Sequence, residues 1–99
     1  MAVYLIANYD ISDPEAYAAY VPGMTPCIMK YNPEILVADY GSKALEGESR
    51  QVNVVIRFES EEKLMAFYND PEYQPFKELR LRTTKNGSLL VANEFVLPT

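Results

Sequence analysis

Tyrosines are the residues of this chain whose number and spacing could do chemistry. Five of the eight fall in segments that we expect to be helical, together with two phenylalanines: Tyr17, Tyr20, Tyr31, Tyr68, Tyr73, Phe67 and Phe76. Facing a sheet, such rings could enclose a pocket for a small, flat organic molecule, with the phenol hydroxyls as its polar contacts. The alternative is that the same rings fill the hydrophobic core, which is the commoner role of aromatic side chains on the inner face of a helix.

One arginine follows the second aromatic segment at helical spacing. Arg80 could therefore point toward the same rings, where its guanidinium would bind a ligand carboxylate or polarise a carbonyl. Alternatively, it forms a salt bridge to a sheet carboxylate such as Glu94 or Asp10. Asn8 is a polar residue inside a predicted strand and could face the same space. We take as candidate ligand-binding residues Asn8, Tyr17, Tyr68, Tyr73 and Arg80, and we assign no catalytic residue.

The sequence contains no histidine. This excludes a histidine general base, a Ser-His or Cys-His nucleophile pair and any imidazole ligand for a metal or haem. There is also no glycine-rich phosphate loop, cysteine cluster or acidic metal motif, so we predict no cofactor and no metal. The single cysteine, Cys27, is interpreted as a small buried hydrophobic residue rather than a nucleophile. Chemistry here would depend on carboxylates, Tyr, Lys or Arg, or on a reactive substrate.

Composition limits the class of protein. The chain has 99 residues, 48% of them hydrophobic, and a net charge of −5, which together predict one globular domain spanning residues 1–99. A nucleic-acid partner is disfavoured because there is no basic face. A membrane span is not expected because no apolar run approaches roughly 20 residues. With a single cysteine and no signal peptide at the start, we expect a cytoplasmic protein.

Periodicity predicts the elements that must position these residues. Alternating patterns predict strands over residues 2–10, 34–40, 52–58 and 88–96, and stripes at three- and four-residue spacing predict helices over 14–31 and 61–68. We expect the first helix to be capped by Asp13 and interrupted at Pro22-Gly23. A further helical segment is expected to begin at Asp70-Pro71 or Gln74-Pro75, and a turn is expected at Asn86-Gly87. The order βαββαβ predicts an α+β, ferredoxin-like sandwich, a four-stranded antiparallel sheet with its helices on one face.

Such a sheet would keep one uncovered face. Three of the predicted strands carry apolar side chains on both faces, among them Leu36, Leu89, Leu90, Val91 and Val96. Soluble monomers rarely expose an apolar patch of that extent. We therefore predict a homodimer that packs through the open sheet face.

Several short motifs, in order along the chain, resemble the DUF1330 family of the dimeric α/β-barrel superfamily. They are Asp13-Pro14-Glu15-Ala16-Tyr17, Lys30-Tyr31, Leu45-Glu46-Gly47, Val54-Val55-Ile56-Arg57-Phe58, Phe67-Tyr68, Asp70-Pro71-Glu72-Tyr73 and Leu79-Arg80. The chain departs from the family pattern at Asn32-Pro33, where a Gly-Gly turn is usual, and at Ala38-Asp39-Tyr40-Gly41, where an Arg-Gly-Gly-like element is usual. The resemblance implies the ferredoxin-like architecture and dimerisation but no common activity. Superfamily neighbours resemble cofactor-free monooxygenases, haem-degrading enzymes and lactone isomerases.

Two functions remain open from the sequence. In the first, the homodimer binds a small apolar or aromatic molecule between helices and sheet, and could oxidise or isomerise it without a cofactor. In the second, the protein is a non-catalytic dimerisation or interaction module whose aromatic residues are all core.

Overall fold

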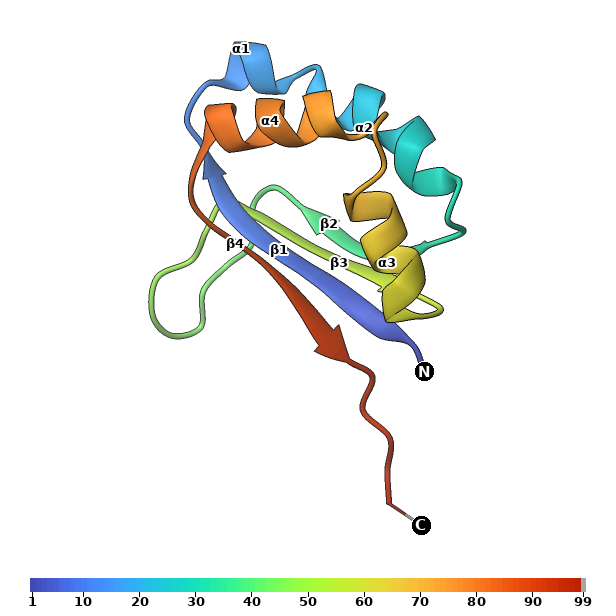
Figure 1. Ribbon diagram of the computed structural model, residues 1–99. Coiled ribbons are helices and arrows are strands. Elements are labelled where there is room, and N and C mark those ends of the chain that lie inside the picture. The colour runs from blue at the N-terminus through green and yellow to red at the C-terminus, as the bar shows by residue number, and fades with distance from the viewer. Residues whose placement is uncertain (99) are drawn as a thin grey trace.

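The computed structural model describes residues 1–98, so the last residue of the predicted domain, Thr99, lies outside the described residues. Its elements follow the predicted order: β1 (Val3–Ile11), α1 (Pro14–Tyr17), α2 (Tyr20–Met29), β2 (Glu34–Asp39), β3 (Val52–Phe58), α3 (Glu61–Tyr68), α4 (Gln74–Thr83) and β4 (Thr84–Asn93). The strands form one antiparallel sheet in the order β2-β3-β1-β4. The helices lie together on one face of that sheet (Figure 1). The predicted ferredoxin-like α+β fold is confirmed.

Strand alternation decides which side chains reach the core. In β1, Val3, Leu5, Ala7 and Tyr9 are buried, whereas the residues between them are only partly buried. In β3, Val52, Ile56 and Phe58 are buried in the same way. Because successive side chains of a strand point to opposite faces, these residues form the face under the helices. The core therefore lies between this face and the helix layer.

The first helical segment is broken, but not at the predicted residues. α1 is capped by Asp13, whose Oδ1 accepts a hydrogen bond from the Ala16 N–H at 3.2 Å. The break falls at Ala18 and Ala19, and α2 then runs through Pro22 and Gly23. Pro22 lies in the first turn of α2, where a backbone N–H has no intrahelical partner to lose. It therefore fits the beginning of a helix instead of interrupting one.

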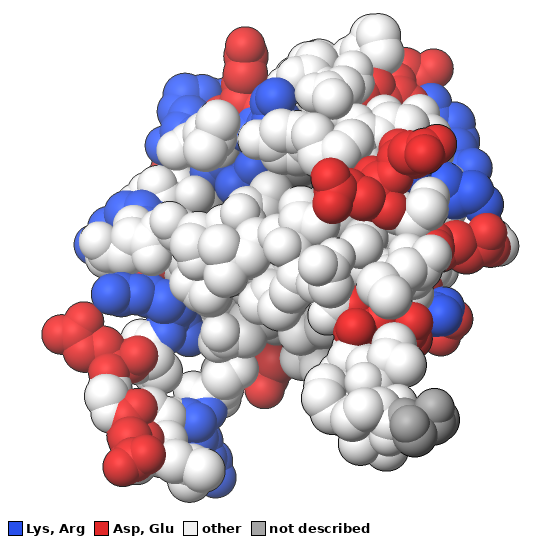
Figure 2. Space-filling model, turned by 60° about the horizontal axis from the view of Figure 1, so that its bottom comes forward, with Lys and Arg blue, Asp and Glu red and all other residues white. Residues whose placement is uncertain are grey.

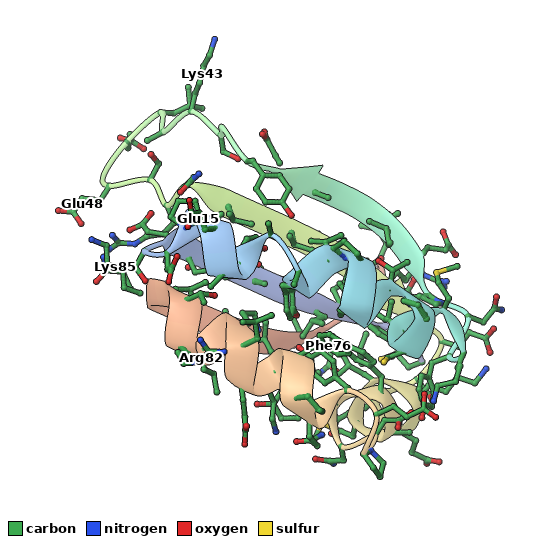
Figure 3. All side chains as sticks on the ribbon, turned by 90° about the horizontal axis from the view of Figure 1, so that it is seen from above. Glu15, Lys43, Glu48, Phe76, Arg82 and Lys85 are labelled. Carbon is green, nitrogen blue, oxygen red and sulfur yellow. The ribbon has the colours of Figure 1, made fainter. Side chains whose placement is uncertain are left out.

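α2 and α4 pack closely at a glycine. A Cβ at Gly23 would lie 2.0 Å from Cε1 of Phe76 on α4, far inside van der Waals contact. Figure 3 shows the Phe76 ring between these two helices. Of the two predicted starts for α4, the structure uses Gln74-Pro75, and Asp70 instead forms a turn in which its Oδ1 accepts from the Glu72 N–H at 2.9 Å. The Gly23 contact fixes the spacing between α2, which carries Tyr20, and α4, which Tyr73 directly precedes.

The predicted limits of the last strand are wrong at both ends. β4 begins at Thr84, before the expected turn, and Asn86 takes a positive φ of 57° inside the strand. The pairing with β1 shifts register there, which is a β-bulge and not a chain reversal. β4 ends at Asn93, which pairs with Val3 at the start of β1. Beyond that point there is no strand residue of β1 left to pair with Val96, and the C-terminal segment extends away from the rest of the fold (Figure 1).

The face opposite the helices is open. Tyr4 and Ile6 of β1 lie on it, Val55 is their neighbour on β3, and Leu90 of β4, which pairs with Ile6, is 52% exposed. Figure 2 shows a broad uncharged area in the middle of the molecule from this side, with charged side chains around its rim. β2 at the sheet edge is exposed along its whole length. Within residues 1–98, no helix is long and apolar enough to cross a bilayer.

Candidate functional site

A cavity of about 120 Å³ lies between the helices and the sheet. All four strands contribute to its floor, and α1, α2, α3 and α4 contribute to its walls. The lining consists of Leu5, Ala7, Tyr9, Tyr17, Tyr20, Val21, Met24, Thr25, Ile28, Ile35, Ala38, Tyr40, Val54, Ile56, Phe67, Tyr73, Arg80 and Leu89. Several lining residues are exposed, among them Val21 of α2, Ile35 of β2 and Tyr40, which follows β2, so the cavity reaches the surface between these two elements.

Four buried tyrosines in the lining form two hydroxyl pairs. Tyr9 and Tyr17 are joined at 2.6 Å between their hydroxyl oxygens, and Tyr20 and Tyr73 at 2.7 Å. The rings of Tyr17 and Tyr20 stack with centroids 5.5 Å apart, which brings the two pairs together. A phenol carries one hydroxyl hydrogen. Each pair therefore uses one hydrogen internally and keeps a second that can be donated to a ligand.

Burial keeps three of these phenols neutral, those of Tyr9, Tyr17 and Tyr20. It raises the pKa of Tyr9, and it raises the pKa of Tyr17 and Tyr20 further, with contributions from their hydroxyl partners. A neutral phenol can donate a hydrogen bond but is a weak base. Among the described lining residues there is no carboxylate, so the cavity presents donors and not a general base.

Arg80 places a positive charge in this apolar site. Its side chain is only 7% exposed, and its Nε is buried without a hydrogen-bond partner. Burial opposes the charge, but the neighbouring phenols of Tyr73 and Tyr20 favour it, and the pKa of the guanidinium is held above its ordinary value. None of the ion pairs found within residues 1–98 involves Arg80.

The salt bridge that we considered for Arg80 is therefore not formed. Asp10 pairs with Arg50 at 3.3 Å, and Glu94 lies 3.8 Å from Arg57. Asp10 also accepts a hydrogen bond from the Gln51 N–H at 2.9 Å. Both carboxylates thus have other partners.

Three of the five candidate residues come together. Tyr17, Tyr73 and Arg80 line the cavity from α1, from the residue before α4 and from α4 itself. Tyr68 does not: it lines a separate apolar hollow between α3 and β4, and the ammonium group of Lys77 lies 4.3 Å from the centre of its ring.

Asn8 lies on the opposite face of the sheet. Its neighbours Ala7 and Tyr9 face the cavity, so strand alternation turns Asn8 outward, where its Oδ1 accepts from the Ser88 hydroxyl at 3.1 Å. There it borders a polar hollow beside the loop of residues 42–50. Arg50 and Asn53 also line this hollow. The prediction that Asn8 lies between the helices and the sheet was therefore wrong.

Sequence reasoning missed Tyr9 and Tyr40 and left Tyr20 out of the site. The alternation of β1 contained the signal for Tyr9, since it shares parity with Val3, Leu5 and Ala7. Tyr20 was recognised as part of the aromatic set, but its pairing with Tyr73 depends on how α2 and α4 pack. Within residues 1–98, no group of three His, Cys, Asp or Glu could hold a metal ion.

Comparison with solved structures identifies the same fold in proteins of remote sequence. RPA0582 of Rhodopseudomonas palustris, a protein of unknown function, matches with a TM-score of 0.83 and 15% identity over 97% of this chain and 84% of its own. A dimeric ferredoxin-like protein of unknown function from Jannaschia sp. CCS1 matches at 0.70 and 12% identity, over 97% of this chain and 100% of its own. A candidate antibiotic biosynthesis monooxygenase from Bacteroides thetaiotaomicron matches at 0.63 and 20% identity, over 96% and 90%.

No curated protein matches the chain. A family does: DUF1330, a domain of unknown function, matches residues 2–94 and so covers almost the whole sequence. The motifs that suggested this family include Tyr17, Tyr73 and Arg80, which meet at the cavity. The chain belongs to the DUF1330 family.

Proposed function

We propose that this protein is a homodimer that binds a small, largely apolar aromatic molecule in the cavity between helices and sheet. The observation that carries the proposal is the cavity itself, an apolar space whose polar side chains are tyrosines, Arg80 and Thr25, and the Thr25 hydroxyl is already hydrogen-bonded to the Val21 carbonyl. Binding sites for small molecules commonly combine an apolar lining with a few convergent polar groups of this kind.

The volume limits the size of the ligand. An apolar cavity of roughly 150 Å³ is large enough to take up benzene, and the space here is about 120 Å³ with an opening toward α2 and β2. A single ring is therefore about the largest body that we expect the space to enclose, with any substituent extending through the opening. Larger, multi-ring ligands would require the walls to move.

The homodimer is supported by the open sheet face. Leu90 is exposed there beside Ile6 and Tyr4, and the centre of this surface carries no charge in Figure 2. Packing two such faces together would bury apolar area that a monomer leaves in water. The structural neighbour from Jannaschia is itself dimeric. Two sheets packed in this way would form the interior of a dimeric α/β barrel, with the helices outside.

Cofactor-independent oxidation or isomerisation is the catalytic form of this proposal. Likeness to a candidate monooxygenase supports it at the level of fold. The site would bind the substrate and exclude water from it. Arg80 and the free phenol hydrogens would donate hydrogen bonds to an oxygen that becomes negatively charged during the reaction. The reactivity would have to come from the substrate, because the described lining offers no strong base.

A non-catalytic module without a ligand is the second candidate. The observation in its favour is that the four tyrosines satisfy one another in pairs, as core residues would. In that case Tyr73→Phe would lower the free energy of unfolding by on the order of 1–3 kcal/mol, because it leaves the buried Tyr20 hydroxyl unpaired. It would have no effect on ligand binding.

Native mass spectrometry of protein purified without added ligand tests the proposal. We expect a dimer at micromolar concentration that carries additional small-molecule mass, or that takes up a neutral aromatic probe, benzamide, after dialysis. Ala38→Leu should reduce this uptake by narrowing the opening, and Ala44→Leu in the exposed loop is its matched control. A monomer would overturn the dimer, and a dimer that takes up neither native ligand nor probe would favour the module.

A further inference from the structure

We propose that the ligand of this cavity is a small aromatic monocarboxylate whose carboxylate is bound by Arg80. This inference rests on the proposed function, since it names the chemical class that the same site would accept. It goes further because it requires a negative charge on the ligand and assigns one residue to recognise it.

The first argument is the unbalanced charge. Arg80 is the one charged residue among the described residues that line the cavity, and none of the ion pairs in residues 1–98 includes it. Its Nε is buried with no hydrogen-bond partner. An isolated buried charge is strongly unfavourable, and buried charges in proteins are normally paired. A carboxylate in the cavity would supply the missing partner and accept hydrogen bonds from the guanidinium.

The second argument is the excess of donors. The Tyr9–Tyr17 and Tyr20–Tyr73 pairs each keep one free hydroxyl hydrogen. Burial keeps the phenols of Tyr9, Tyr17 and Tyr20 protonated. The polar groups of the site thus offer hydrogens and a positive charge, which suits a group with several acceptor lone pairs. A carboxylate provides about four such positions and no hydrogen.

The third argument separates an anion from a neutral acceptor. A ketone, amide or lactone oxygen could take the phenol hydrogens equally well, but it would leave the charge of Arg80 uncompensated. Charge-assisted hydrogen bonds are roughly twice as strong as neutral ones, and an arginine can bind a carboxylate through two parallel N–H groups. Apart from Thr25, whose hydroxyl donates to the Val21 carbonyl, the remaining lining is apolar, and the space that it encloses is about the size of one ring. One carboxylate on a flat hydrocarbon body therefore matches both parts of the cavity.

Benzoate and benzamide form a matched pair of probes, because they share a ring and differ in the charge of one planar substituent. We expect titration calorimetry at neutral pH to show benzoate binding at least about tenfold more tightly than benzamide, as expected when a charge-assisted hydrogen bond replaces a neutral one. In Arg80→Met this preference should disappear. Arg82→Met makes the same chemical change two residues later on α4, where the side chain is exposed (Figure 3), and should keep the preference.

A second readout places the probe at the guanidinium. The buried Nε–H of Arg80 should give an NMR resonance that is absent from Arg80→Met and shifts when benzoate, but not chloride at equal concentration, is added. The comparison of the two probes on the wild-type protein decides the charge preference even if Arg80→Met does not fold.

The outcomes distinguish this inference from the function on which it rests. Equal binding of benzoate and benzamide would overturn the carboxylate and leave the aromatic-binding cavity standing. Tighter binding of benzoate that persists in Arg80→Met would overturn the role of Arg80. Failure of the wild-type protein to bind either probe would overturn both proposals.

Discussion

Gly23→Ala tests the helix packing that shapes the cavity. The substitution should destabilise the protein when residue 76 is phenylalanine and stabilise it when residue 76 is alanine. The new Cβ would lie 2.0, 2.4 and 2.5 Å from three ring atoms of Phe76, where carbon atoms prefer roughly 3.5–4.0 Å. Phe76 must therefore retreat by more than an ångström, or α2 must separate from α4. Either movement removes apolar contacts that the half-buried ring makes in the structure.

Two energies oppose each other in this variant. Overpacking a closely packed site costs about 1–3 kcal/mol. Replacing glycine by alanine within a helix returns about 0.5–1 kcal/mol through backbone entropy. The clash is the larger of the two, so Gly23→Ala should destabilise the protein by about 1–2 kcal/mol. In the Phe76→Ala background the obstacle is gone, and the same substitution should stabilise by about 0.5–1 kcal/mol.

Urea denaturation of the four proteins of this cycle, all at one protein concentration, measures the effect. A loss of 1 kcal/mol corresponds to a fall in Tm of about 4–8 °C for a domain of this size, so thermal unfolding gives an independent check. Gly41→Ala is a control with open space around the added methyl group. If Gly23→Ala stabilises the protein in both backgrounds, the close approach of α2 and α4 is not present and the shape of the cavity must be revised.

Three further predictions concern the dimer, the acid limit of stability and the hydroxyl pairs. Leu90→Lys on the open sheet face should convert the dimer to a monomer in size-exclusion chromatography, whereas Leu45→Lys, in a loop where that residue is 99% exposed, should leave it intact. The pKa of Asp70 is lowered to about 2, chiefly by hydrogen bonds from Lys30 and Tyr31. Because the pKa is lower in the folded protein than in the unfolded chain, the ionised carboxylate stabilises the fold above the ordinary pKa, and this stabilisation is lost as the pH falls through the folded value. The urea midpoint of the wild type should therefore fall between about pH 4 and pH 2, and Asp70→Asn should lack this part of the pH dependence. Tyr20→Phe and Tyr73→Phe should each lower the free energy of unfolding by about 1–3 kcal/mol, because each strands a buried hydroxyl, and the double variant should lose less than the sum. Additive losses would show that the two hydroxyls are not paired.

Local patterns predicted the elements that contain no special backbone geometry. The bounds of β3 and α3 match the prediction because strict alternation runs over Val52–Phe58 and a serine cap precedes Glu61–Tyr68. The errors fall where a local signal has two structural meanings. Asn86 with positive φ is typical of a turn and equally of a bulge, and only pairing with β1 decides between them. Pro22 can break a helix or lie in its first turn, depending on where the helix begins.

The candidate site was predictable only where its residues lie within one helix or strand. Tyr73 and Arg80 are seven residues apart, two turns of a helix, so their common side could be inferred from the sequence. Strand parity would also have replaced Asn8 by Tyr9. The hydroxyl pairs could not be inferred, because the partners are 8 and 53 residues apart and come from different elements. The Tyr20–Tyr73 contact depends on how closely α2 approaches α4, and at Gly23 that approach leaves no room for a Cβ.

The partner of Arg80 shows most clearly what tertiary structure adds. The chain has 14 acidic residues, and Asp10 and Glu94 were reasonable partners by sequence. Both, however, pair with arginines outside the cavity: Asp10 with Arg50, and Glu94 with Arg57. Arg57 lies on the open face of β3, whereas Arg80 enters the cavity from the helix layer. The sheet thus separates Arg80 from carboxylates that the sequence could have offered it. A residue held in that position gains little for folding, since an apolar side chain of similar size would avoid the burial of a charge. Its presence is best explained by something that enters the cavity with the opposite charge.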